Sequence, residues 1–335
     1  MKLLWLDLNS SYAHSSLALP ALHAQIADDT TIEWCIVSAT INENTGMVVS
    51  RIHKHRPDII AATNWLFNHE QLLHIISRAK ALLPHCCIVL GGPEFLGNNE
   101  AFLYKNKFVS GVFRGEGEEV FPQWLKVWNH SKETWKAITG LCYLDENGRY
   151  QDNGIARVMN FSQLVSPEKS CFFNWSKPFV QLETTRGCFN TCAFCVSGGE
   201  KPVRTIPLEA IRERLNDIHQ HGIKNVRVLD RTFNYNNKRA KELLDLFRQY
   251  PDICFHLEIH PALLSEELKQ ELSVLPKGLL HLEAGIQSLK ESVLQQSRRI
   301  GKLSDALEGL KYLCSLKNME THADLIAGLP LYHLS

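Results

Sequence analysis

The amino-acid sequence predicts an α/β protein in which a doubly wound parallel sheet is followed by a partial (β/α) barrel. Two series of short β-rich runs, each alternating with amphipathic stretches, indicate these architectures. The chain of 335 residues is too long for one ordinary hydrophobic core, so more than one domain is expected. We expect a first domain at 1–135, a hairpin and linker at 136–175, and the barrel at 176–335.

The first series indicates the doubly wound sheet. Its expected strands are 2–8, 31–39, 58–63, 86–92 and 109–115, and its expected helices lie near 15–27, 46–55, 69–83, 97–105 and 117–129. In such sheets, ligands bind beyond the carboxyl ends of the strands. The loops at these ends are rich in glycine and small polar residues, which lets a backbone approach a bulky ligand closely. The candidate ligand-binding residues in these loops are Asn9, Ser10, Asn64, Trp65, Gly91, Gly92, Pro93, Gly115 and Glu116.

A different pattern occupies 138–165. An apolar run is followed by Asn147-Gly148, a dipeptide typical of a two-residue hairpin turn, and then by a second short strand. Polar residues and Pro167 come next. This segment is therefore expected to be a small hairpin with a linker.

The second series indicates the partial barrel. Its expected strands are 179–185, 225–230, 254–259, 279–286 and 321–328, and its expected helices lie near 207–221, 237–249, 265–274, 289–296 and 303–317. Repeated strand–helix units of this kind form a (β/α) barrel or an open arc of one. The last strand leads into "GLPLYHLS" without a further helix. We therefore expect a chain that is truncated at its C-terminus or that obtains the missing units elsewhere.

Three of the 10 cysteines lie within one loop of the expected barrel. Cys188, Cys192 and Cys195 have the spacing C-x3-C-x2-C and follow the first barrel strand. Three thiolates can bind three irons of a [4Fe–4S] cluster, which ordinarily takes four cysteines. The missing fourth ligand would leave one iron open. A zinc site completed at long range and a set of reduced core thiols remain alternatives, and none of the 15 histidines has a defensible metal-ligand spacing.

Composition and charge exclude several classes of partner. Lys+Arg and Asp+Glu number 36 each, so no bulk charge attracts nucleic acid or anionic lipid. The amino-terminal apolar run is too short for a signal peptide, and no stretch of about 18 apolar residues predicts a membrane span. We expect a cytoplasmic protein whose clustered thiols stay reduced.

The cysteine segment resembles that of radical S-adenosylmethionine (SAM) enzymes. The likeness rests on the three cysteines, on "TRGC" before them and on Phe194 before the last one. The resemblance implies that the open iron chelates SAM, and that an electron from the cluster cleaves SAM to methionine and a 5′-deoxyadenosyl radical. It further implies a small-molecule substrate and a reductant such as flavodoxin or ferredoxin.

Later segments resemble the cobalamin-type radical SAM enzymes. "HLEAGIQSLKESVLQQSRR" is similar to their fourth strand and "DLIAGLP" to their fifth. The resemblance places Glu283 and Gln287 at the SAM or substrate end, where the strand tips also put Asp230 and Glu258, and where we include Phe194. A salt bridge with a neighbouring helix is the structural alternative for each acidic residue. The sequence identifies no catalytic residue.

The first domain resembles the flavodoxin- or Rossmann-like cobalamin-binding domain of the same enzymes. "PDIIAATNWLFN", "IVLGGPEF" and "FRGEGEEVF" carry the likeness, and "NSSYAHSSLAL" is similar to the start of an uncharacterised bacterial subgroup. The nine candidate loop residues would then form a cobalamin site. The usual D-x-H-x-x-G is absent, since Asp7 and His14 lie seven residues apart. Either cobalt has no protein ligand beneath it, or the domain has lost the cofactor.

Together these patterns predict a radical SAM enzyme that performs cobalamin-dependent methyl transfer or a radical rearrangement. A methylthiotransferase-like RNA-modifying enzyme is one alternative, but it would need three cysteines in the first domain. Only Cys35, Cys86 and Cys87 lie there, and adjacent strand residues point to opposite faces. An Fe–S electron carrier or sensor is the non-enzyme alternative.

Overall fold

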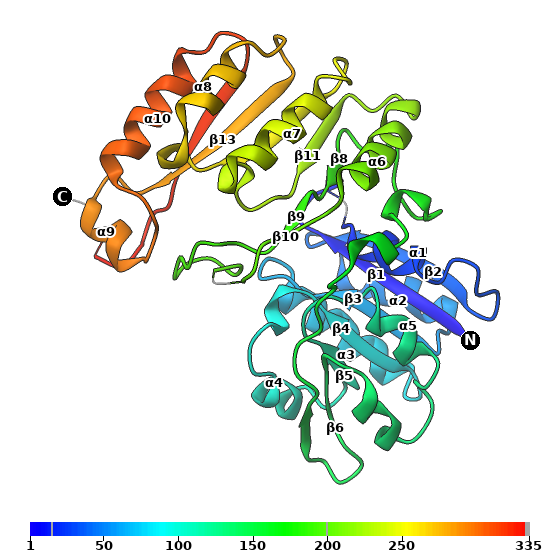
Figure 1. Cartoon of the computed structure of the whole chain (residues 1–335). Coiled ribbons are helices and arrows are strands. Elements are labelled where there is room, and N and C mark those ends of the chain that lie inside the picture. The colour runs from blue at the N-terminus through cyan, green and yellow to red at the C-terminus, as the bar shows by residue number, and fades with distance from the viewer. Residues whose placement is uncertain (15, 199, 332–335) are drawn as a thin grey trace. The chain divides into compact units, whose positions relative to one another are not determined.

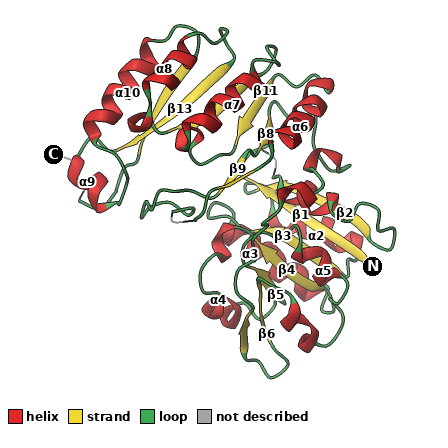
Figure 2. Cartoon of the chain, viewed as in Figure 1, coloured by secondary structure: helices red, strands yellow, loops and turns green. Residues whose placement is uncertain are grey.

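The computed structural model describes residues 1–14, 16–198 and 200–331. It divides into two compact units, Met1–Lys177 and Pro178–Ser335. Each unit combines helices with a central sheet (Figure 1), and the strands of both units stand out in yellow in Figure 2. The predicted fold class, a doubly wound sheet followed by a partial (β/α) barrel, is confirmed.

The first unit contains a seven-stranded sheet in the order β2-β1-β3-β4-β5-β6-β7. The strands are β1 (Lys2–Asn9), β2 (Glu33–Thr40), β3 (Ile59–Thr63), β4 (Cys87–Gly91), β5 (Gly111–Phe113), β6 (Leu141–Leu144) and β7 (Tyr150–Asp152). The helices are α1 (Ala18–Ala24), α2 (Thr45–His55), α3 (His69–Leu82), α4 (Glu100–Lys105) and α5 (Val120–Leu125). The first five strands are parallel, and their order is that of a flavodoxin-like fold. Residue 15, the start of the first expected helix, lies outside the described residues.

The sheet of the first unit is buried on both faces. Leu4 and Leu6 of β1 belong to one hydrophobic cluster, and Leu3 and Trp5 of the same strand belong to the other. A strand covered on both faces needs apolar residues at consecutive positions. This explains why the first strand reads "KLLWLDL" rather than alternating between apolar and polar residues.

The hairpin of β6 and β7 continues this sheet. β6 pairs antiparallel with β5, and β7 pairs antiparallel with β6. Farther along the chain, Ala156 forms an isolated bridge with Gly115. The hairpin therefore belongs to the sheet of the first unit. The domain boundaries at 135 and 175 stay a prediction.

The second unit contains a five-stranded parallel sheet in the order β14-β13-β12-β11-β8. Its strands are β8 (Val180–Leu182), β11 (Asn225–Val228), β12 (Cys254–Ile259), β13 (Leu280–Gln287) and β14 (Glu320–Leu325), beside the short pair β9 (Thr185–Arg186) and β10 (Arg204–Thr205). Its helices are α6 (Leu208–Gln220), α7 (Asn237–Phe247), α8 (Glu266–Ser273), α9 (Glu291–Gln296) and α10 (Leu303–Ser315). The sheet is an open arc, and residues 332–335 of the expected barrel lie outside the described residues.

The two faces of this arc differ in chemistry. Along β12 and β13, every second residue is a buried apolar one, such as Phe255, Leu257 and Leu282. The residues between them are only partly buried and most are polar, including His256 and Glu283. The strands therefore present one apolar face and one face that carries the polar chemistry of the unit.

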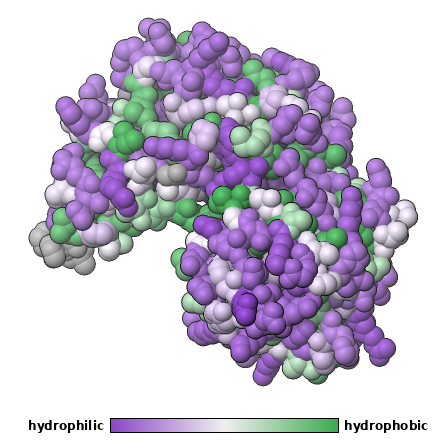
Figure 3. All heavy atoms as spheres, turned by 60° about the horizontal axis from the view of Figure 1, so that its bottom comes forward, coloured by the Kyte–Doolittle hydropathy of each residue, from purple (hydrophilic) through white to green (hydrophobic). Residues whose placement is uncertain are grey.

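Hydrophilic side chains cover most of the face of the molecule shown in Figure 3, with hydrophobic ones scattered among them. In the described ranges, no helix combines the length and the apolar character needed to cross a bilayer.

Candidate functional site

The three clustered cysteines lie on a loop that begins after β9. Cys188 and Cys192 are buried, Cys195 is partly exposed, and all three are free thiols. The amide of Cys188 donates to the carbonyl of Glu200 at 2.8 Å, which closes the loop at its base. A Cβ added at Gly198 would lie 2.4 Å from the carbonyl oxygen of Cys192, so the loop folds too tightly there for any other residue.

The electrostatics of the loop suit a metal centre. Burial raises the pKa of the Cys192 thiol, and Cys195 and Cys188 raise it further, whereas Arg299 lowers it. As thiolates, the three sulfur atoms would therefore repel one another. Positively charged iron would relieve that repulsion, and thiolate sulfur is the usual ligand of Fe–S clusters. The donor set present thus fits such a cluster.

The segment after α9 ties the cysteine loop to β13. The Arg299 guanidinium lies 4.0 Å from Cys192 Sγ through Nη1 and donates to the carbonyl of Gly285 at 2.6 Å through Nη2. The amide of Ala193 donates to the carbonyl of Ser297 at 2.9 Å. Arg299 was not predicted from the sequence, because "SRR" after a short helix carries no signal of this long-range contact.

Asp230 supports the start of the same loop. Its buried carboxylate accepts hydrogen bonds from the amides of Thr184 and Thr185, at 2.8 and 2.9 Å, and from the Thr184 hydroxyl. Burial raises the pKa of Asp230, and these hydrogen bonds partly oppose that effect. The structure places Asp230 just beyond β11, and a contact with SAM or substrate remains a prediction.

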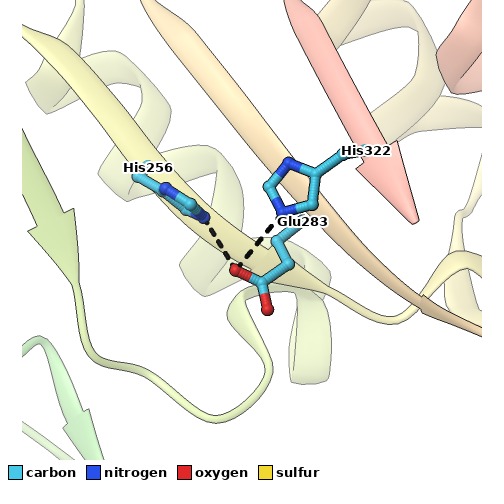
Figure 4. Close-up of side chains that lie close together, drawn as sticks. All are labelled: His256, Glu283 and His322. Atoms are coloured by element: carbon cyan, nitrogen blue, oxygen red, sulfur yellow. Dashed lines mark hydrogen bonds and ion pairs between the residues drawn. The ribbon is translucent and has the colours of Figure 1, made fainter. Parts of the chain in front are cut away.

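Two predicted glutamates come together on the polar face of the arc. Glu258 of β12 and Glu283 of β13 are neighbours in the strand register. Burial and the charge of Glu283 raise the pKa of Glu258 to about 7. Figure 4 shows Glu283 between His256 and His322, with its Oε2 2.9 Å from His256 Nε2 and 3.6 Å from His322 Nε2. Burial lowers the pKa of His256 to about 4, so this ring is neutral at physiological pH.

The two other predicted residues of this unit are Gln287, at the end of β13, and Phe194, in the cysteine loop. Gln287 occupies a left-handed backbone position with φ +69° at the end of β13, and its carbonyl accepts from the amide of Ile326 at 2.9 Å. Phe194 is partly buried within the cysteine loop. The place of both residues at a cofactor stays a prediction.

In the first unit, the candidate loops follow the strands as expected, and those after β3 and β4 pack closely. The amide of Asn64 donates to the carbonyl of Gly91 at 2.7 Å. Gly92 has φ +112°, and a Cβ there would lie 2.5 Å from the carbonyl oxygen of Asn64. Pro93 begins the helical turn that follows. Asn64 is fully buried, and its Oδ1 lacks a hydrogen-bond partner within the part of the chain that the structure describes.

Large apolar side chains are exposed beside these loops. Tyr12 follows β1 and is 87% exposed, while Leu66 and Phe67 follow β3 and are 83% and 47% exposed. Trp65 stacks on Phe67 with ring centroids 6.3 Å apart. Exposed apolar and aromatic groups at the ligand edge of a parallel sheet fit a large, flat cofactor such as a corrin.

The remaining candidates of this unit contact the protein. A Cβ at Gly115 would lie 2.2 Å from the carbonyl oxygen of Ala156, and Glu116 Oε2 accepts from the amide of Val158 at 2.7 Å. Asn9 donates to Asp7 at 2.8 Å, and Ser10 Oγ lies 3.5 Å from His14 Nδ1. Gly115 and Glu116 thus hold the segment after the hairpin, and ligand contacts by these residues stay predictions.

Comparison with known families decides the identity of both units. A family model described as "B12 binding domain" matches residues 8–125, and one described as "Radical SAM superfamily" matches residues 182–332. The chain is a radical SAM protein with a B12-binding domain. The predicted family is therefore confirmed.

Curated relatives of this radical SAM protein include methyltransferases. An uncharacterized methyltransferase from Pyrococcus horikoshii is 26% identical over 83% of this chain and 62% of its own length. The cobalamin-dependent radical SAM methyltransferase TokK from Streptomyces tokunonensis is 19% identical over 82% of this chain and 43% of its own. A tRNA-2-methylthio-N(6)-dimethylallyladenosine synthase from Acinetobacter baylyi is 29% identical, over 52% of this chain and 37% of its own. The chain thus spans about two-fifths to three-fifths of these relatives.

A solved structure shares the fold of this chain. The cobalamin-dependent SAM radical enzyme OxsB, with aqua-cobalamin and SAM bound, superposes with a TM-score of 0.77 at 17% identity. The match covers 97% of this chain and 49% of that one.

Proposed function

We propose that this radical SAM protein is a cobalamin-dependent methyltransferase that acts on a small molecule. The observation that carries the proposal is the single loop with three free cysteines, Cys188, Cys192 and Cys195. These thiolates would hold three irons of a [4Fe–4S] cluster and leave one iron for SAM. When bound and reduced, the cluster supplies the electron that cleaves SAM to methionine and a 5′-deoxyadenosyl radical.

Residues around the loop would prepare the site for this chemistry. The Arg299 guanidinium places positive charge beside Cys192 and so offsets part of the negative charge of the thiolates. Asp230 fixes the backbone at the loop entrance. Glu258, with a pKa of about 7, can hold or release a proton near neutral pH. Phe194, Glu283 and Gln287 complete the residues that we propose for the SAM or substrate end.

The first unit would hold the cobalamin, which supplies a methyl carrier when bound. The loops after β1, β3 and β4 offer the exposed apolar groups Tyr12, Leu66 and Phe67 to a corrin face, and Asn64 offers a buried oxygen. We propose that no side chain would bind cobalt, because the chain lacks the D-x-H-x-x-G spacing and the Asp7 carboxylate accepts from Asn9. The names of the methyltransferase relatives support methyl transfer over rearrangement.

Two further parts of the proposal concern the setting of the reaction. A small electron donor such as flavodoxin or ferredoxin would reduce the cluster. All ten cysteines are free, which suits a reducing cytoplasm. The methylthiotransferase alternative is weaker, because its relative matches half of this chain. A second cluster would also need three converging cysteines before residue 138, where Cys86 and Cys87 pack on opposite faces of the sheet.

Anaerobic reconstitution with iron and sulfide tests the cluster. We expect Cys192→Ala to lose the visible absorption of the cluster while its far-UV circular dichroism stays unchanged. Cys314→Ala, at an exposed cysteine on α10, is the matched control and should keep the absorption. An unchanged spectrum in Cys192→Ala would refute the ligand assignment.

Cobalamin binding is tested separately. The protein is incubated with hydroxocobalamin and passed through a gel-filtration column, and we expect the cofactor colour to elute with the protein. A colourless protein fraction would refute the proposed role of the first unit.

A further inference from the structure

A histidine–glutamate cluster lies on the polar face of the second unit, and it includes Glu283, which we also propose for the SAM or substrate end. His256 of β12, Glu283 of β13 and His322 of β14 each offer one ligand atom, and these atoms all lie within 4.8 Å of one another. Figure 4 shows the three side chains converging from three adjacent strands. We propose that His256, Glu283 and His322 form a binding site for a divalent first-row transition-metal ion.

The strand register brings the three residues together. Glu283 pairs with His322 across β13 and β14, and His256 pairs with His281, two residues before Glu283, across β12 and β13. All three strands are parallel and about 4.8 Å apart, and residues two apart on a strand share a face. The convergence therefore follows from the backbone of the sheet and does not depend on a flexible loop.

The separations suit a single ion. Glu283 Oε2 lies 2.9 Å from His256 Nε2 and 3.6 Å from His322 Nε2. Ligand atoms at about 2.1 Å from a tetrahedral ion lie roughly 3.4 Å from one another. Small side-chain rotations would thus open a space for the ion among the three atoms.

Neighbouring residues orient the ligands. His281 Nε2 lies 2.9 Å from His322 Nδ1, which leaves Nε2 of His322 directed at Glu283. The ring of His256 stacks on that of His281 with centroids 4.7 Å apart. Histidine ligands of metal ions commonly have such a second hydrogen-bond partner, which fixes the ring tautomer.

The donor set indicates the class of metal and of further ligand. Two imidazoles and one carboxylate suit Zn²⁺, Fe²⁺ or Co²⁺, and three protein ligands leave at least one position open. The side chains of His256, Glu283 and His322 are 17%, 26% and 43% exposed, so a small molecule can reach the ion. An oxygen donor such as a carboxylate or water would take the open position.

Cobalt titration of the full chain tests this site without the iron–sulfur cluster. In a variant with Cys188, Cys192 and Cys195 all changed to Ser, we expect one Co²⁺ per chain, seen by its visible ligand-field absorption. Adding Glu283→Gln or His322→Ala should weaken Co²⁺ binding at least tenfold. His53→Ala, at an exposed histidine on α2, is the matched control and should leave it unchanged.

The possible results separate this site from the proposed methyltransferase. Absence of stoichiometric Co²⁺, or equal binding in Glu283→Gln and the control, would overturn the metal site and leave the cysteine ligands untouched. Loss of binding in both ligand variants, with native circular dichroism, would support the site even if no cluster assembled in the parent chain. Because His322 lies on an edge strand, His322→Ala tests the site even if Glu283→Gln misfolds.

Discussion

The entrance of the cysteine loop depends on one buried carboxylate, and we expect Asp230→Ala to destabilise the second unit strongly. The substitution removes the acceptor of two buried amides, those of Thr184 and Thr185, and of the Thr184 hydroxyl. A buried donor left without a partner costs about 1–3 kcal/mol. Loss of the two amide partners alone should lower the free energy of unfolding by about 2–6 kcal/mol.

The distribution of tryptophans lets this effect be located. All 7 tryptophans lie between residues 5 and 175, in the first unit, whereas far-UV circular dichroism reports both units. For a urea m-value of about 2 kcal/mol per molar, a loss of about 4 kcal/mol lowers the unfolding midpoint by about 2 M. We expect this shift in the dichroism of the second unit and no shift in the tryptophan fluorescence transition.

An isosteric variant provides the control. Asp230→Asn keeps an oxygen for both amides and replaces the second oxygen with an NH₂ group that can donate to the Thr184 hydroxyl. It should therefore lose about 1 kcal/mol or less. Equal midpoints for Asp230→Ala and the wild type would refute the idea that Asp230 supports the loop, as would an equal loss in both variants.

Two more substitutions test other parts of the structure. Gly92→Ala should lower the fluorescence-detected urea midpoint more than Gly148→Ala does. Both positions have positive φ, but only a Cβ at position 92 would clash with the backbone of Asn64. Equal losses in the two variants would contradict this. Glu258→Gln should remove a pH dependence of stability. The raised pKa of Glu258 means that its stabilising contribution is complete below pH 4.5 and is lost as the pH rises through about 7. The wild type should therefore lose stability relative to Glu258→Gln between about pH 5 and about pH 8. A difference in the free energy of unfolding that stays constant over this range would show that the pKa of Glu258 is not raised.

The elements and the cysteine loop could be predicted from the sequence because local patterns determine them. The alternation of strands and helices indicated the fold class, and strand ends agreed to within about three residues where apolar runs end at glycine or polar residues. The spacing of Cys188, Cys192 and Cys195 was enough to identify the candidate cluster ligands. Each of these signals lies within a short stretch of chain.

Long-range pairing set the limit of the prediction. The hairpin of β6 and β7 was expected beside a linker, but its strands also complete the edge of the first sheet, and edge pairing leaves no local pattern. Arg299 reaches Cys192 from 107 residues away. The scattered histidines showed no metal spacing because His256, Glu283 and His322 meet only through the register of three strands.

The central claim is that three thiolates leave one iron of a cluster open to SAM. The most direct test is to reduce the reconstituted protein with dithionite under argon and to measure the products formed from SAM by chromatography. We expect 5′-deoxyadenosine and methionine in equal amounts, with none formed by Cys192→Ala. Intact SAM in the presence of a fully assembled, reduced cluster would contradict the claim, as would purified protein that holds zinc at the three cysteines.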